Sequence, residues 1–114
     1  MQRLALMMVV WLMVGAATVN AQEKFESDTI KTSAGELRIT FIGHGTLMFT
    51  FGGQVIHMDP VAQYADYGQL PKADLILITH EHRDHLDAKA VEKLRKADTR
   101  IVLPQAAAGQ VAGG

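Results

Sequence analysis

The 114-residue sequence contains no cysteine and only three prolines, and its net charge is close to zero. The absence of cysteine excludes disulfide bonds, a lipid-modified cysteine anchor and metal sites built on thiolates. A formal net charge of −1 gives no electrostatic basis for binding nucleic acid or an anionic membrane, so we expect neither as a partner. A small domain without disulfides must be held together by other means, or be part of a larger fold.

The first 21 residues have the order of a secretory signal peptide. Arg3 precedes an apolar run over residues 4–14, and small residues follow up to Ala21. The run is shorter than the about 20 apolar residues of a spanning helix, which disfavours the alternative of a retained membrane anchor. We expect cleavage after Ala21, export to the periplasm or the medium, and a mature domain at residues 22–114 with no stable membrane anchor.

The first part of the mature chain predicts an antiparallel β-meander. Residues 36–42 alternate apolar and polar side chains with the period of a half-buried strand. Residues 46–51 and 54–58 form two further candidate strands, and the glycine pair between them is a hairpin signal. Residues 25–33 form a weaker candidate strand that precedes this meander.

A strand, a helix and a strand follow the meander. Residues 74–79 are almost continuously apolar, which favours a strand buried on both faces. Asp87 can cap a helix over residues 88–96, and residues 100–103 form another apolar strand. This order predicts a βαβ-like unit and an α/β fold class.

The helix at 88–96 is amphipathic. Its expected buried face consists of Ala90, Val91 and Leu94, and Glu92 and Lys96 are spaced to form an ion pair one turn apart. Residues 61–72 are predicted to form a long surface loop. Tyr64 and Tyr67 within that loop are candidates for a substrate-facing wall, or are ordinary surface residues, which is the more common case.

Chemistry is concentrated between residues 79 and 87. His80, His82, Asp84 and His85 lie directly after an apolar strand and before a helix, and imidazole and carboxylate are ligands for Zn²⁺ and similar ions. In extended chain, side chains two residues apart point the same way, so His80 and His82 can bind one ion together. Asp84 and His85 can bind a second ion nearby. A solvated, His-rich loop is the alternative, and the spacing disfavours it.

These residues resemble a known family. The run from His80 to His85 matches the HxHxDH signature of the metallo-β-lactamase superfamily. Gly43-His44 and Asp59-Pro60 upstream are similar to the pattern of the branch that contains UlaG-like lactonases and uncharacterised metal-dependent hydrolases. The resemblance covers roughly residues 36–104. It implies the N-terminal half of an αββα sandwich.

The resemblance also implies roles for individual residues. His80 and His82 would bind the first metal and Asp84 and His85 the second, with Asp84 as the candidate catalytic residue. Asp59 would hold a ligating imidazole from beneath, or simply end a strand before Pro60. His44 would contact the substrate or a ligand, or only occupy a turn. His57 is expected to be structural.

The expected activity is hydrolysis of an ester, lactone, amide or phosphoester in a small-molecule substrate by metal-bound hydroxide. The expected cofactor is Zn²⁺, two ions in the complete fold, although the same ligands accommodate manganese or iron. A di-iron redox centre is a less favoured alternative.

Members of the family also use a third histidine, a bridging aspartate and a final histidine farther downstream. No histidine follows His85 in this sequence. We therefore expect a truncated and inactive fragment of low stability, in which the helix and the strand at 100–103 lack the opposite layer that they should pack against. The alternative is a small exported metal-binding module, or a homo-oligomer that completes its site at an interface.

Overall fold

The structure is a computed structural model that describes residues 24–114. The predicted signal peptide at residues 1–21 lies outside the described residues. Within residues 24–114, no helix is both long enough and apolar enough to cross a membrane.

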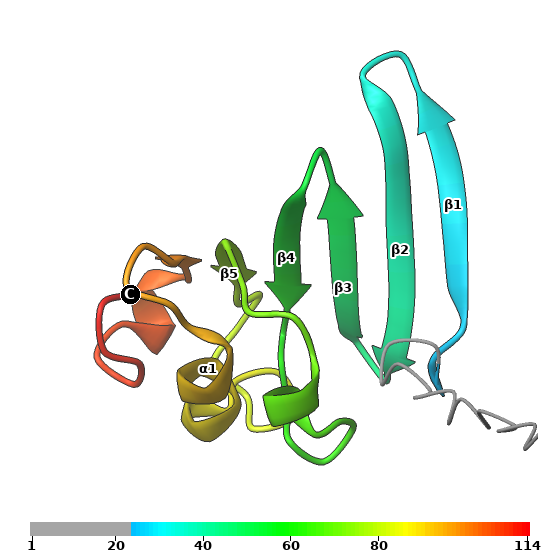
Figure 1. The fold of residues 1–114 in the computed structure, drawn as a ribbon. Coiled ribbons are helices and arrows are strands. Elements are labelled where there is room, and N and C mark those ends of the chain that lie inside the picture. Colours follow the sequence, from blue (N-terminus) through cyan, green and yellow to red (C-terminus); the bar gives the residue numbers. More distant parts are fainter. Residues whose placement is uncertain (1–23) are drawn as a thin grey trace, which may run out of the picture.

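One six-stranded mixed sheet forms the framework, with the strands side by side in chain order (Figure 1). The first four strands are antiparallel, and the last two run parallel to β4, which confirms the predicted meander and strand–helix–strand order. The strands are β1 (Ser27–Thr32), β2 (Gly35–Gly43), β3 (Thr46–Phe51), β4 (Gln54–Met58), β5 (Leu75–Leu77) and β6 (Arg100–Val102).

The strand β5 is shorter than the predicted strand at 74–79 and is buried on one face only. Ile76 is fully buried, whereas Leu75 and Leu77 on the other face are half-buried. Asp74 lies directly before β5. Its backbone amide donates to the Val55 carbonyl at 2.8 Å, and its carboxylate accepts the Val55 amide at 2.7 Å. The prediction of burial on both faces is therefore wrong among the described residues.

Helix α1 (Ala88–Leu94) begins at the predicted cap. One carboxylate oxygen of Asp87 accepts the amides of Lys89 and Ala90, at 3.0 and 3.3 Å. The helix ends two residues earlier than predicted, because Arg95 adopts an extended conformation. The predicted Glu92–Lys96 pair is consequently wrong. Instead, Glu92 pairs with Arg95 at 2.7 Å, and Lys96 pairs with Asp74 of the sheet.

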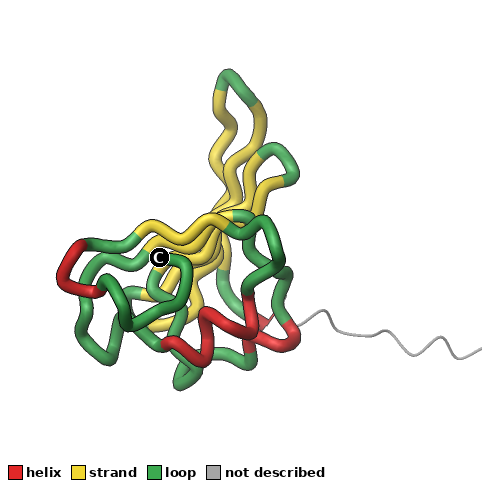
Figure 2. Tube along the Cα trace, turned by 90° about the vertical axis from the view of Figure 1, so that its left-hand side faces the viewer, coloured by secondary structure: helices red, strands yellow, loops and turns green. Residues whose placement is uncertain are grey.

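The helix and the long loop cover one face of the sheet (Figure 2). The expectation that α1 lacks a packing partner is wrong, because its predicted face of Ala90, Val91 and Leu94 is fully buried. The loop at 61–72 is not a simple surface loop, since it contains the 3₁₀ helix η2 (Tyr67–Gln69) and buries Tyr67. The C-terminal segment also contributes to the hydrophobic core, because the 3₁₀ helix η3 (Gln105–Ala107) buries Ala107.

The opposite face of the sheet is apolar and largely uncovered among the described residues. Ile30 on β1, Phe41 on β2 and Val102 on β6 are 48%, 44% and 53% exposed, so large apolar side chains are open to solvent across the width of this face. A groove of about 440 Å³ runs along this face. It is lined by Thr32, Leu37, Phe49, Phe51, Ile56, Met58 and Leu77.

We expect this open face to make the chain bind the dye ANS and to self-associate, because contiguous exposed apolar surface favours both. The double variant Phe41→Glu/Val102→Lys should reduce ANS fluorescence at least about twofold and shift the chain toward monomer. Lys31→Glu, on the other side of β1, is the matched control. A monodisperse, ANS-negative unsubstituted chain would contradict this expectation.

The strand register brings distant parts of the chain to one edge of the sheet. Leu47 pairs with Met58, and Met58 pairs with Leu77. The β2–β3 turn before Leu47, the residues after Met58 and the residues after Leu77 therefore emerge together. These three segments carry the predicted site residues.

Candidate metal centre

The predicted ligands lie on the loop between β5 and α1. The carbonyl of His82 accepts the amides of His85 and Leu86 at 2.9 and 2.8 Å, and this tight turn folds the loop back on itself. The ring centroid of His80 lies 4.7 Å from that of His82 and 4.0 Å from that of His85. Ligand atoms of His80, His82 and Asp84 lie within 4.8 Å of one another.

Asp59 lies beneath this loop as a buried acceptor, with its side chain 2% exposed. Its carboxylate accepts the amide and the hydroxyl of Thr79, at 2.7 and 2.6 Å. Its Oδ2 atom also lies 2.7 Å from Nδ1 of His85. Since a carboxylate accepts, Nδ1 of His85 carries the proton, and Nε2 keeps the lone pair that a metal needs.

The same carboxylate acts on His80 through Thr79. The Thr79 hydroxyl donates to Asp59 and therefore accepts from Nδ1 of His80, which lies 2.9 Å away. This contact leaves Nε2 of His80 unprotonated as well. One buried aspartate thus determines the tautomer of two candidate ligands.

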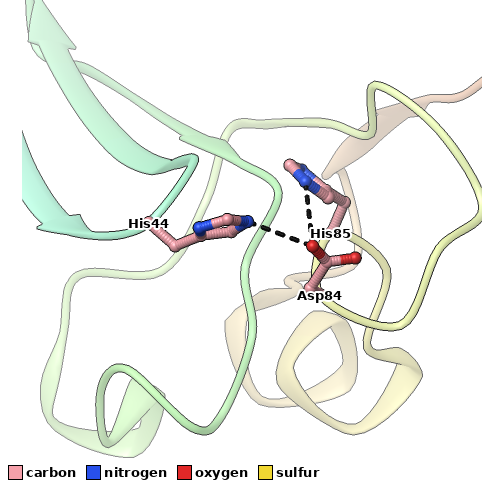
Figure 3. Close-up of side chains that lie close together, drawn as sticks. All are labelled: His44, Asp84 and His85. Atoms are coloured by element: carbon pink, nitrogen blue, oxygen red, sulfur yellow. Dashed lines mark hydrogen bonds and ion pairs between the residues drawn. The ribbon is translucent and has the colours of Figure 1, made fainter.

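His44 reaches the loop from the β2–β3 turn, 40 residues away in sequence (Figure 3). Its Nε2 atom lies 3.0 Å from Oδ2 of Asp84, and Nε2 of His85 lies 3.5 Å from the same oxygen. Ligand atoms of His44, Asp84 and His85 form a second group within 4.8 Å.

The β2–β3 turn packs tightly against its surroundings. A Cβ atom on Gly45 would lie 2.8 Å from the ring of His85, and one on Gly43 would lie 3.0 Å from the ring of Tyr64. The rings of Tyr64 and His44 stack with centroids 6.0 Å apart. Glycine on both sides of His44 is therefore required for this approach.

Asp84 is held in its ionised form. Partial desolvation raises the pKa of its carboxyl, but hydrogen bonds from its own backbone amide and from His44, with the nearby His85, outweigh this and leave the pKa below its usual value. Asp84 is half exposed, so an ion at this position would be open to solvent and substrate.

The residues present fit a divalent cation. Three overlapping groups of imidazole and carboxylate atoms lie within 4.8 Å, and the third consists of Asp59, His80 and His85. Nitrogen and oxygen donors of this kind suit zinc, manganese or iron. Hydrogen bonds to the far ring nitrogens of His80 and His85 supply the orientation that metal-binding histidines usually require.

Sequence reasoning missed three contributors to this site. Thr79 directly precedes the first histidine, and its hydroxyl there was the available signal. Gly45 follows His44, but only the packing against His85 reveals why a side chain is excluded. The sequence offers Tyr64 only as a candidate substrate wall, and in the structure its ring stacks on that of His44. His57, expected to be structural, is fully buried and binds the Pro71 carbonyl at 3.0 Å.

Comparison with known families agrees with this geometry. A family model described as a β-lactamase superfamily domain matches residues 38–113, which is most of the described chain. The chain belongs to the metallo-β-lactamase superfamily. The matched segment contains His44, Asp59 and all four candidate ligands of the HxHxDH motif.

Relatives within this superfamily include metal-dependent hydrolases. One from Cupriavidus necator is 34% identical over 92 residues, covering 72% of this chain and 32% of the relative. Another from Anaeromyxobacter dehalogenans is 37% identical over 71 residues, covering 55% of this chain and 26% of the relative. Their names describe them as metal-dependent and do not say which metal they use.

A solved structure gives the same result for the fold. A crystal structure of a candidate metal-dependent hydrolase from Parabacteroides distasonis is 50% identical, with a TM-score of 0.76. The match covers 79% of this chain and 41% of that chain. This superfamily member and the two curated relatives are therefore matched over less than half of their length.

Proposed function

We propose that this chain is the metal-holding part of a metal-dependent hydrolase that acts on an ester, lactone, amide or phosphoester in a small molecule. The single observation that carries the proposal is that His80 and His85 are both linked by hydrogen bonds to the buried Asp59. His85 contacts its carboxylate directly, and His80 is linked to it through the Thr79 hydroxyl. That pairing leaves an unprotonated Nε2 on each ring. A polar surface loop would have no need to fix both tautomers.

The chain's own residues supply the scaffold for this chemistry. His80, His82, Asp84 and His85 would hold the ion, with zinc as the proposed metal, and up to two ions are supported by the overlapping groups. A bound divalent ion supplies Lewis acidity, which lowers the pKa of water and polarises the substrate. The exposed position of Asp84 keeps this edge of the sheet accessible to a small molecule.

Export is a further part of the proposal. It is supported by the basic, apolar and small-residue order of the first 21 residues, which is typical of a signal peptide. A small exported metal-binding module, or a homo-oligomer that completes the site, remains the second candidate. The uncovered apolar sheet face favours such association.

Metal uptake is the direct test. We expect the purified chain, dialysed against Zn²⁺ and analysed by mass spectrometry, to retain at least about one equivalent of zinc, because convergent imidazole and carboxylate donors bind it. His82→Ala should lower the zinc affinity at least about tenfold, since it removes a ligand. Removing the metal with a chelator should abolish any hydrolysis of ester and phosphodiester reporter substrates.

Glu81→Gln and Arg83→Gln are matched controls, because these exposed residues alternate with the candidate ligands in the same loop. Both controls should retain zinc. Equal zinc content in the His82 variant and the controls, or no zinc in the unsubstituted chain, would overturn the proposed site. Zinc uptake without any turnover would favour the binding module over the hydrolase.

A further inference from the structure

The backbone of His44 is the first unusual feature of the β2–β3 turn. Among residues 24–114, His44 and Asp59 are the non-glycine residues with a positive φ, 51° and 47°. This left-handed region is sparsely populated by residues with a side chain. Such residues gather at functional sites, where the surrounding structure maintains them. Both of these residues contact candidate metal ligands.

The turn that carries His44 is held from several sides. The Thr46 hydroxyl donates to the Asp59 carbonyl at 2.7 Å. This bond links the turn to the residue beneath the loop of candidate ligands at residues 78–87, here called the metal loop. On either side of His44, an added Cβ on Gly43 or Gly45 would meet the ring of Tyr64 or His85. The turn therefore has little freedom to move relative to the loop.

Asp84 differs from His80 and His85 in the hydrogen bonds that orient its side chain. His85 is held by a buried carboxylate and His80 by a threonine hydroxyl. The Asp84 side chain is half exposed, and the imidazole of His44 is its closest side-chain partner, at 3.0 Å. The oxygen that His44 contacts, Oδ2, also lies 3.5 Å from Nε2 of His85. A carboxylate oxygen has two lone pairs, so Oδ2 can accept from His44 and still face a cation beside His85.

We propose that His44 is a positioning residue, which donates from Nε2 to Asp84 and holds its carboxylate in the orientation needed to bind the metal. This inference rests on the proposed metal centre. The stacked ring of Tyr64 restricts rotation of the imidazole. The hydrogen bond also connects two segments 40 residues apart, so the turn and the metal loop are aligned before an ion binds.

Two substitutions separate the ring from the hydrogen bond. His44→Phe keeps an aromatic ring against Tyr64 and removes the donor. His44→Gln removes the ring and keeps an amide N–H at the same number of bonds from the backbone as Nε2. The dissociation constants for Zn²⁺ and Co²⁺ are measured by competition with a chelator, and urea unfolding of the metal-free variants serves as the stability control.

We expect His44→Phe to weaken metal binding about 10- to 100-fold, the usual effect of losing a group that orients a ligand. His44→Gln should restore most of the affinity, and the visible spectrum of bound Co²⁺ should return toward that of the unsubstituted chain. X-ray absorption should count the same number of imidazoles around zinc in the Gln variant as in the unsubstituted chain.

Each other outcome has a distinct meaning. Unchanged affinity in His44→Phe overturns the positioning role and leaves the metal centre intact. Failure of His44→Gln to rescue, with one imidazole fewer around zinc, shows that His44 is itself a ligand and also overturns it. No metal uptake by the unsubstituted chain overturns the metal centre, and the role of His44 with it.

Discussion

Replacing Asp59 by alanine is expected to lower the free energy of unfolding by about 3–5 kcal/mol, which is a large part of the stability of a small domain. The variant removes the acceptor for the Thr79 amide, the Thr79 hydroxyl and Nδ1 of His85. These three hydrogen bonds are partly buried, and a fully buried donor without an acceptor costs about 1–3 kcal/mol. The positive φ of 47° at Asp59 adds a further cost for alanine.

Asp59→Asn is expected to separate stability from metal binding. Asparagine has nearly the same volume, tolerates a positive φ and keeps one oxygen for the Thr79 amide. Its amide N–H group would instead face Nδ1 of His85 and favour the tautomer with the proton on Nε2. That tautomer has no lone pair for a metal, so zinc affinity should fall about 10- to 100-fold while most of the stability is retained.

Urea unfolding and zinc titration of both variants check these expectations. Nitrogen chemical shifts of the His85 ring report directly which nitrogen carries the proton. Wild-type zinc affinity in Asp59→Asn would show that the carboxylate does not determine the tautomer. A small loss of stability in Asp59→Ala would show that its hydrogen bonds contribute little.

The second large effect is loss of stability in acid through His57. Its ring is fully buried, and desolvation by burial lowers its pKa from 6.5 to about 4, against the opposing effect of the hydrogen bond to the Pro71 carbonyl. The unfolded chain binds the proton at a higher pH than the folded chain does. The contribution of His57 is therefore complete above pH 6.5 and is lost as the pH falls toward 4.

We expect the metal-free chain to lose about 3 kcal/mol of unfolding free energy through His57 between pH 7 and pH 4. His57→Gln keeps a donor for the Pro71 carbonyl and does not titrate, so its stability should depend less steeply on pH over this range. The neighbouring Tyr67 remains neutral, because desolvation raises its pKa to about 12. Parallel pH profiles for the two proteins would contradict the assignment.

Much of the fold follows from local patterns. Alternating side chains and the Gly52-Gly53 turn predicted the meander, and Asp87 predicted the start of the helix, because both depend on neighbouring residues. The predicted end of the helix, at residue 96, is wrong by two residues, because α1 ends at Leu94. Lys96 leaves it to pair with Asp74, and that partner lies 22 residues away.

The candidate site divides in the same way. The four candidate ligands could be predicted from the sequence, because the donor types and their spacing lie within six consecutive residues. The contacts of Thr79, Gly45 and Tyr64 could not be predicted from the sequence. Each depends on how the β2–β3 turn and the loop at 61–72 pack against the metal loop.

The sequence by itself determined the donor chemistry, the order of the strands and the position of the metal loop after an apolar strand. These properties depend on residue types and short spacings. Only the tertiary structure decided that Asp59 controls two imidazoles and that His44 meets Asp84. The reason is the register: Leu47, Met58 and Leu77 align, and this brings three distant segments to one edge of the sheet.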